Sequence, residues 1–288
     1  MIRNILVPAT GNDSDATCFA TALAAARIFS AHIDALHVRF DPVDVAVAMS
    51  SDGAGGALLE GIIDGLNREA DDRERKARAA FTAFCARADL MLGGVPSSST
   101  VRASADWHVE TGREGAWTTA YGMTADLIVA GRGTPGDDAA ARSLLETLLL
   151  ETGRPLLIPG NGTGGTDGFD RVAVAWKPTP QASRAVSYAL PFLAAAKDVA
   201  VITVEEEEGR RDEVDRLVGY LGWHGIKPQV QRLSPSPLGG AETLLAVSAE
   251  TRLLVMGGYG HSRLREWVFG GFTQRVLADA PMPVLMAH

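Results

Sequence analysis

The feature that most limits how this chain can fold is an internal repeat. Residues 4–38, NILVPATGNDSDATCFATALAAARIFSAHIDALHV, and residues 171–204, RVAVAWKPTPQASRAVSYALPFLAAAKDVAVITV, share one plan of strand, turn, Ala-rich helix and strand. Further along each half, ADLIVAGRG at 125–133 parallels TRLLVMGGYG at 251–260. Landmarks in the same order indicate a duplication, so we expect both halves to share one fold.

Within each half, short β-branched runs alternate with helical segments, which indicates βαβ units and a parallel sheet. The pattern predicts an α/β protein with two tandem doubly wound sheets of five parallel strands each. The first half has predicted strands at 3–8, 32–39, 106–110, 126–130 and 155–159, and predicted helices at 13–29, 57–92, 113–124 and 142–152. The second half has predicted strands at 171–176, 199–204, 228–233, 252–256 and 282–286, and predicted helices at 180–196, 209–224, 239–250 and 271–279.

A glycine-rich stretch separates the halves. Residues 159–168, PGNGTGGTDG, contain five glycines and too little apolar surface to order themselves, so they read as a flexible linker. We therefore predict a first domain at 1–160, a linker at 161–169 and a second domain at 170–288. The last predicted strands of the two halves, 155–159 and 282–286, are expected to pair within the chain and hide two sheet edges.

Composition excludes several classes of protein. The chain has 27 basic and 35 acidic residues, a net charge of -8 and no basic stripe, so nucleic acid is not an expected partner. No run reaches the roughly 18 apolar residues of a membrane span, and no long apolar leader begins the sequence. The two cysteines, Cys18 and Cys85, suit a reducing compartment without disulfides. We expect a cytoplasmic protein.

The candidate ligand site lies in the second half, in MGGYGHSRLREWVFGGFT at 256–273. This segment follows a predicted strand, and ligands of doubly wound sheets bind at the carboxyl ends of strands. Its glycines let successive backbone N–H groups converge on an anion. Gly270 and Gly271 open a predicted helix whose first N–H groups are unpaired. The segment therefore has the position and backbone freedom of a phosphate loop.

At these residues the chain resembles the universal stress proteins, specifically their tandem-domain members. Nucleotide-binding members carry Gly, two residues, Gly, nine residues, Gly and then Ser or Thr. Here Gly257, Gly260 and Gly270 match that spacing, and Gly271 stands at the hydroxyl position. The resemblance covers nearly the whole chain and implies an adenine-nucleotide alpha-hydrolase-like fold. It also implies a non-enzymatic protein that binds ATP, ADP or AMP, with Mg²⁺ as a companion ion.

The resemblance assigns roles to single residues. Val204 and Met256 would flank the adenine and ribose, and Lys177 stands where nucleotide-binding members place an Asp that accepts a hydrogen bond from adenine. A lysine ammonium can only donate. Thr273 is a candidate replacement for the missing hydroxyl, or simply satisfies the helix start. The predicted nucleotide-binding residues are Lys177, Val204, Met256, Gly257, Gly260, Gly270, Gly271, Phe272 and Thr273.

Cations in the same loop, His261, Arg263 and Arg265, are further candidates for screening phosphate charge. An acidic run such as that at 205–208 more often forms a solvated loop than a metal site. No glycine loop ends in Gly-Lys-Ser or Gly-Lys-Thr, which disfavours a P-loop NTPase, and the histidines show no metal-ligand spacing.

The first half is expected to have lost nucleotide binding. GRGTPG at 131–136 spells a dinucleotide fingerprint but follows the fourth strand instead of the first. Thr134 replaces the second glycine of the family motif, and Arg142 and Ser143 replace the last pair. At the end of the first strand Thr10 corresponds to Lys177, and we expect Asp13 and Asp15 to cap the first helix. The apolar segment at 45–63 is either a subunit contact or a cover over this half.

Three functions follow from the sequence. The first is a non-enzymatic adenine-nucleotide sensor or adaptor of the stress response with one site, in the second half. The second is a scaffold protein whose halves pair as an internal pseudo-dimer and which has lost nucleotide affinity, as Lys177 and Gly271 favour. The third, a slow ATP hydrolase, ranks last because the motif holds no general base. Association of two chains into a homodimer is left open.

Overall fold

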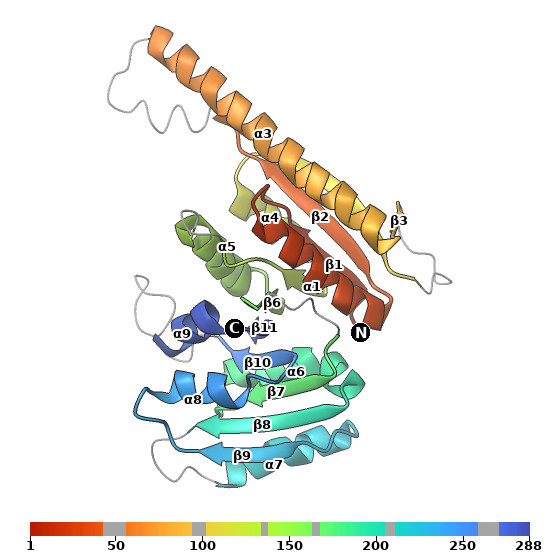
Figure 1. Cartoon of the computed structure of the whole chain (residues 1–288), viewed down its shortest axis with the longest axis vertical. Helices are drawn as coiled ribbons and strands as arrows, with labels where there is room; N and C mark the ends of the chain where they lie inside the picture. Colours follow the sequence, from red (N-terminus) through yellow and green to blue (C-terminus); the bar gives the residue numbers. More distant parts are fainter. Residues whose placement is uncertain (43–55, 94–101, 134–137, 163–167, 205–210, 259–270) are drawn as a thin grey trace. The chain divides into compact units, whose positions relative to one another are not determined.

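The computed structural model describes residues 1–42, 56–93, 102–133, 138–162, 168–204, 211–258 and 271–288. These residues form two compact units (Figure 1). The first unit is Arg3–Thr152, and the second is Gly153–His288 together with Met1–Ile2. Both are α/β structures, which confirms the predicted fold class.

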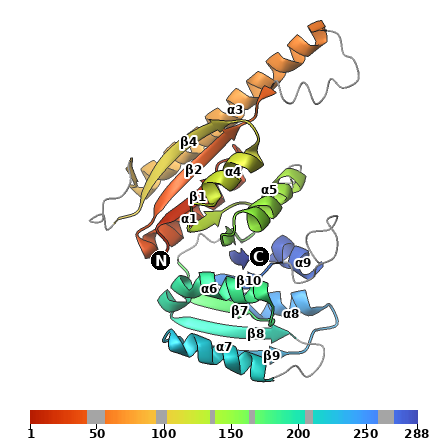
Figure 2. The same ribbon diagram turned by 180° about the vertical axis from the view of Figure 1, so that it is seen from behind.

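The first unit has a parallel sheet in the order β3-β4-β2-β1-β5. Its strands are β1 Asn4–Pro8, β2 His32–Arg39, β3 Met91–Leu92, β4 Ser104–Thr111 and β5 Leu127–Val129. Its helices are α1 Ser14–Phe29, α3 Gly56–Ala88, α4 Glu114–Gly122 and α5 Asp138–Glu151. Figures 1 and 2 show α1 and α3 on one face of this sheet and α4 and α5 on the other. Because helices cover both faces, β1 and β5 are continuous apolar runs rather than alternating ones.

Aromatic packing holds α3 against α1. The ring of Phe19 on α1 stacks on Phe84 at a centroid distance of 5.0 Å and also contacts Phe81. The predicted helix at 57–92 is wrong at its end, because α3 stops at Ala88. Asp89 adopts the left-handed conformation, with φ +51°, which terminates the helix and turns the chain. Met91–Leu92 then forms the short strand β3, which the sequence did not predict.

The second unit has its strands in the order β6-β11-β10-β7-β8-β9. They are β6 Leu156–Ile158, β7 Arg171–Ala175, β8 Asp198–Val204, β9 Gln229–Leu233, β10 Leu253–Gly257 and β11 Val284–Ala287. Its helices are α6 Pro180–Ala195, α7 Arg211–Trp223, α8 Gly240–Val247 and α9 Gly271–Asp279. α6 and α7 lie on one face of this sheet, and α8 lies on the other (Figures 1 and 2).

The strand β6 ends the first repeat in sequence but pairs with β11, the last strand of the second. The pairing is antiparallel, with Leu157 opposite Leu285, whereas β7 to β11 pair in parallel. These are the two strands expected from the sequence to pair. Pairing of the two domains as whole bodies stays a prediction.

The start of the predicted linker is hydrogen-bonded. Asn161 N donates to Ala280 O at 3.0 Å, and Gly162 N donates to Pro281 O at 3.1 Å. A Cβ added at Gly162 would lie 2.7 Å from Pro281 O, so a close backbone approach requires a glycine there. At least one glycine of this stretch therefore serves packing rather than flexibility.

Candidate functional site

The carboxyl edge of the second sheet contains a reversal of strand order. The chain passes from β7 to β8 and β9 on one side, then returns through α8 to β10 on the other side of β7. Ala175 pairs with both Ile202 and Met256. Lys177, Val204 and Gly258 each lie two residues further along the chain than Ala175, Ile202 and Met256. The register of the three strands therefore brings them to one edge. A reversal of this kind is where doubly wound sheets bind ligands.

Gly257 ends β10 directly against the start of α6. A Cβ added there would lie 2.5 Å from Ala182 N and 2.8 Å from Gln181 C, distances that real Cβ atoms do not show. The preceding residue, Met256, is 4 % exposed, so the Met256 side chain packs in the core at this edge. Packing alone therefore accounts for a glycine at position 257, whatever ligand the edge binds.

Lys177 projects from the turn between β7 and α6. Its carbonyl accepts a hydrogen bond from Thr179 N at 2.7 Å, and Thr179 Oγ1 accepts from Ala182 N at 3.2 Å. Thr179 is thus the N-cap of α6, and Pro180 occupies the first turn. The turn is fixed at its backbone while the Lys177 side chain is exposed. Its ammonium group is available to an anion or an acceptor at this edge.

The start of α9 lies at the same edge, and some of its residues are exposed while others are packed. A Cβ added at Gly271 meets no atom within 4 Å, so this position has room for a side chain. Phe272 is 43 % exposed, and its ring lies over Gly240, the first residue of α8, beside Val204. Thr273 is 8 % exposed, so most of this residue is buried at the helix start, and its role as a replacement hydroxyl stays a prediction.

The helices α8 and α9 are tied together beside this edge. Arg275 Nε lies 3.0 Å from Glu242 Oε1 and 2.8 Å from Asp279 Oδ2. Glu242 belongs to the first turn of α8, and its charge is compensated by Arg275. Gly239 precedes α8 with φ +118°, which requires a glycine, and provides no capping side chain.

Part of the predicted site cannot be placed. Gly260, Gly270, His261, Arg263, Arg265 and the acidic run 205–208 lie outside the described residues, as do Thr134 and most of 45–63. Of the predicted residues, the structure brings Lys177, Val204, Met256, Gly257, Gly271 and Phe272 to one edge of one sheet. Sequence reasoning missed Gly240, whose signal was the Gly-Gly pair just before a helical pattern.

The equivalent edge of the first unit is filled by its own polar groups. The carboxylate of Asp15 accepts hydrogen bonds from Thr10 N, Thr10 Oγ1 and Gly11 N at 2.8–2.9 Å. The expected caps of α1 are wrong: Asp13 makes no capping hydrogen bond, and Asp15 turns back to the β1 turn instead. The converging N–H groups after β1 thus already hold an internal anion.

Helix α3 closes over the same turn. A Cβ added at Gly11, which has φ +81°, would lie 2.6 Å from Arg73 O, and Arg73 Nε donates to Thr10 O at 3.4 Å. Burial raises the pKa of Asp15 above its usual value, although the hydrogen bonds from Thr10 and Gly11 oppose the shift. Burial also raises the pKa of Glu114 at the start of α4, against the field of Arg73. Polar side chains, rather than open space, occupy this edge, and Asp15 among them is fully buried.

The sequence matches no family model and no curated protein. The structure does match solved structures over both repeats. A universal stress protein from Archaeoglobus fulgidus superposes with a TM-score of 0.68 at 18% identity, covering 99% of this chain and 95% of that one. A Pseudomonas aeruginosa protein of unknown function superposes at 0.55 with 15% identity, covering 99% of this chain and 92% of that one.

The chain has the universal stress protein fold. The match spans both halves of the chain, which agrees with the duplication in the sequence. It confirms the fold that the resemblance implied. The roles of single residues do not follow from a likeness of fold and depend on the geometry of this chain.

In the first unit, a cluster of polar side chains that the sequence did not predict lies between β2 and β4. We call it the His–Asp cluster, and it consists of His32, Asp34, Asp106 and His108. Asp34 Oδ1 lies 3.2 Å from His32 Nε2 and 3.0 Å from His108 Nε2. Burial alone would raise the pKa of Asp34, but hydrogen bonds from His32, Asn4 and His108 lower it to about 2. The signal in the sequence was the i, i+2 spacing of polar residues in both strands.

This cluster resembles a hydrolase triad but is not placed to act as one. His32 Nδ1 lies 2.8 Å from Ser104 Oγ, while His32 Nε2 faces Asp34. Ser104 is 3 % exposed, so a substrate cannot reach its hydroxyl. Among the described residues, no three His, Cys, Asp or Glu side chains are placed to share a metal ion. We therefore read the cluster as a structural brace between β2 and β4.

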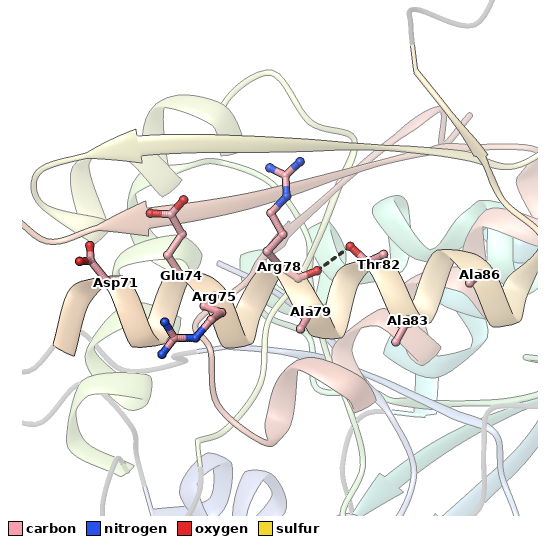
Figure 3. Close-up of a pocket in the computed structure, with 8 residues that line it drawn as sticks. All are labelled: Asp71, Glu74, Arg75, Arg78, Ala79, Thr82, Ala83 and Ala86. Carbon is pink, nitrogen blue, oxygen red and sulfur yellow. Dashed lines mark hydrogen bonds between the residues drawn. The ribbon is translucent and has the colours of Figure 1, made fainter. Parts of the chain in front are cut away.

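Two remaining features of the described residues do not form a binding site. Burial raises the pKa of both thiols, that of Cys85 to about 11, so neither is a reactive thiolate. A shallow groove along α3 is lined by one helix only (Figure 3); its residues are Asp71, Glu74, Arg75, Arg78, Ala79, Thr82, Ala83 and Ala86.

In the described part of the chain, no helix has the length and apolar character needed to cross a bilayer.

Proposed function

We propose that this protein is a tandem universal stress protein that binds an adenine nucleotide, ATP in the first place, at the carboxyl edge of its second sheet. It would act as a non-enzymatic sensor or adaptor in a stress response. The observation that carries the proposal is the contrast between the two edges. In the second unit Lys177 is exposed and Gly271 faces open space, whereas in the first unit Asp15 and Arg73 fill the corresponding turn.

The described residues suggest how a nucleotide would lie. Its phosphates would meet the start of α9, where the first N–H groups carry the positive end of the helix dipole, with Mg²⁺ as counter-ion. The Lys177 ammonium would add a second positive group at the same edge. The base and ribose would lie toward Val204 and the backbone of β10. Gly260 and Gly270 would complete the phosphate loop.

The first test is equilibrium binding of ATP, ADP and AMP to purified protein that has been freed of bound ligand. Gly271→Ser adds a hydroxyl in a position where the structure has room. A hydrogen bond of about 1 kcal/mol corresponds to a roughly fivefold gain in affinity for ATP. Gly271→Ala is the matched control, because it adds the Cβ without the hydroxyl. No binding of wild-type protein at millimolar ATP would refute the proposal.

A charge reversal tests the location of the site. Lys177→Glu places a negative charge at the carboxyl edge, and Lys227→Glu makes the same change just before β9, at the amino end of the strands. Both lysines are exposed in the second unit, so net charge changes equally. We expect Lys177→Glu to weaken ATP binding and Lys227→Glu to leave it unchanged. Equal effects of the two variants would show that the site is elsewhere.

A scaffold function without nucleotide is the alternative, and Lys177 favours it because an ammonium cannot accept a hydrogen bond from an adenine amino group. In that case the pairing of the two domains within the chain, or of two chains, would carry the function. A hydrolase would need a general base at this edge. Glu242, the one carboxylate in the first turn of α8, is paired with Arg275, which disfavours this function. A single-turnover hydrolysis assay tests this third function.

A further inference from the structure

Helix α3 has an exposed stripe whose charges are separated by sign along its length. The exposed residues between Glu60 and Arg87 recur every three or four positions and so form one face of the helix, which we call the outer face. From 60 to 72 the charged residues of this face are five acids and one base: Glu60, Asp64, Glu69, Asp71, Asp72 and Arg68. From 75 to 87 they are four bases: Arg75, Lys76, Arg78 and Arg87. The two halves therefore carry net charges of -4 and +4.

Effects within the helix account for only part of this pattern. The helix dipole favours acids in the first turn and bases in the last, and of these residues only Arg87 lies in either turn. Opposite charges three or four residues apart stabilise the centre, where Asp72 is paired with Arg75. Glu60 and Arg87 lie about 40 Å apart along the axis, so they cannot pair in this way. Within the described part of the chain neither of them forms an ion pair, and neither does Glu69.

The outer face also carries small residues on both sides of its charged centre. In the second half these residues line the shallow groove of Figure 3, and they are Ala79, Thr82, Ala83 and Ala86. Thr82 Oγ1 donates to Arg78 O at 2.8 Å, so this hydroxyl needs no partner from outside. In the first half the small residues are Gly61 and Gly65. One helix alone leaves the groove open, but a second helix can approach such a face closely, because side-chain size at the contact sets the distance between helix axes.

The packing of the described chain does not explain the two glycines. A Cβ added at Gly61 or Gly65 meets no described atom within 4 Å, and neither residue has a left-handed φ. Glycine weakens the interior of a helix relative to alanine. This half of α3 also projects beyond the sheet (Figures 1 and 2), and from 60 onward its first buried residue is Ala70. A close contact with another molecule would account for both the glycines and the projection.

We propose that the outer face of α3 is an interface with a second copy of this chain, in which the two α3 helices lie antiparallel about a two-fold axis. The partner must present a basic segment to the acidic half and an acidic segment to the basic half. A second α3 in the antiparallel direction has this pattern, and a two-fold axis makes the contact self-complementary. A parallel arrangement would bring like charges together. The inference is independent of nucleotide binding, because α3 belongs to the first unit.

The charges also select a register for the two helices. The axis that fits best passes between Arg73 and Glu74. Opposite charges of the two copies then face each other at four pairs of positions: Glu60 and Arg87, Glu69 and Arg78, Asp71 and Lys76, and Asp72 and Arg75. Small residues face each other at two more: Gly61 and Ala86, and Gly65 and Thr82. An axis at Asp72 would instead place this carboxylate against its own copy.

The test measures self-association of the full-length protein by analytical ultracentrifugation at about 50 mM and about 500 mM salt. We expect a dimer that weakens as salt rises, because exposed charges are screened. Glu60→Lys with Glu69→Lys, and separately Arg78→Glu with Arg87→Glu, place like charges at two of the four facing pairs. Each double variant alone should dimerise roughly tenfold or more weakly than wild type. A mixture of the two restores opposite charges and should form the heterodimer.

Arg184→Glu with Lys227→Glu is the matched control, because it reverses two exposed bases of the second unit and changes the net charge equally. It should leave dimerisation unchanged. Circular dichroism verifies that every variant is folded.

A second variant tests the close approach of the helices independently of charge. Gly65→Gln adds a good helix former where the described chain has room, so the melting temperature of the monomer should not fall. The added side chain would hold the two helices apart, so dimerisation should weaken. Gly219→Gln in α7 is its control, because a Cβ there also meets no described atom within 4 Å. It should leave the dimer unchanged.

Three results would overturn the inference. The first is a wild-type protein that stays monomeric at about 100 µM in low salt. The second is a dimer that neither the charge reversals nor Gly65→Gln weaken, which would place the interface elsewhere. The third is a pair of folded charge variants that fail to associate when mixed, which would refute the antiparallel arrangement.

Discussion

Replacing Gly257 by alanine should destabilise the second unit although the change adds a single methyl group. The added Cβ would lie 2.5, 2.8 and 2.9 Å from three backbone atoms of Gln181 and Ala182. Ordinary contact begins at about 3.4 Å, so the start of α6 would have to retreat by about 0.9 Å. Backbone atoms at the start of a capped helix cannot move as a side chain does.

The magnitude follows from two opposing effects. Overpacking of this kind costs about 1–3 kcal/mol, while Gly→Ala recovers about 0.4–1 kcal/mol by restricting the unfolded chain. We expect a net loss of about 1–2 kcal/mol, which in a unit of this size lowers the melting temperature by roughly 4–8 °C. Calorimetry measures the loss, and hydrogen exchange of the β10 and α6 amides assigns it to the second unit.

Gly271→Ala is the control, because the same methyl group there meets nothing within 4 Å. Its free energy of unfolding should change by less than about 0.5 kcal/mol. The reasoning is refuted if Gly257→Ala is as stable as Gly271→Ala. A confirmed loss would also show that substitution of Gly257 is a poor probe of ligand binding, because it perturbs the fold itself.

Three other predictions concern stability. Asp34→Asn should cost about 1–2 kcal/mol at pH 7, since the folded pKa of about 2 lies below the unfolded value near 3.9 and the side chain is 19% exposed. Urea unfolding should show this difference above pH 4 and lose it as the pH falls from about 4 to about 2, where Asp34 takes up its proton. Gly219→Ala in α7 should raise stability by about 1 kcal/mol in the same assay, because the helix has open space there. Gly11→Ala should destabilise the first unit by about 1–3 kcal/mol, since it combines a φ of +81° with a contact of 2.6 Å to Arg73 O; an unchanged denaturation midpoint would contradict the packing of α3 on this turn.

The two repeats show that a glycine motif can be recognised in the sequence although the packing that requires the glycine is visible only in the structure. Gly131 and Gly257 align, and both approach the helix that follows the first strand of their repeat. A Cβ at Gly131 would lie 3.1 Å from Cys18 Sγ and from Ser14 Cβ, which is closer than ordinary contact, and at Gly257 it would meet backbone atoms at 2.5–2.9 Å. The glycine shared by the repeats is thus accounted for by packing, and only the later residues of the loop can report on a ligand.

Sequence periodicity predicted most of the elements, because burial on both faces of a parallel sheet requires apolar runs that are visible locally. It was wrong at the end of α3, where Asp89 at φ +51° stops the helix before Met91. The start of α1 agrees with the prediction, but the expected capping by Asp13 and Asp15 was wrong, because Asp15 hydrogen-bonds to the β1 turn. In both cases the outcome depends on where the backbone turns rather than on the apolar pattern.

The sequence by itself determined the duplication, the alternation of strands and helices, and the carboxyl edge where Lys177 and Gly271 lie. These features are encoded in local order and spacing along the chain. Only the tertiary structure decided that Arg73 and Asp15 fill the first edge, that the His–Asp cluster joins β2 to β4, and that Phe272 rests on Val204 and Gly240. Each of these contacts joins residues from separate elements, and no local pattern specifies which side chains meet when the sheet brings those elements together.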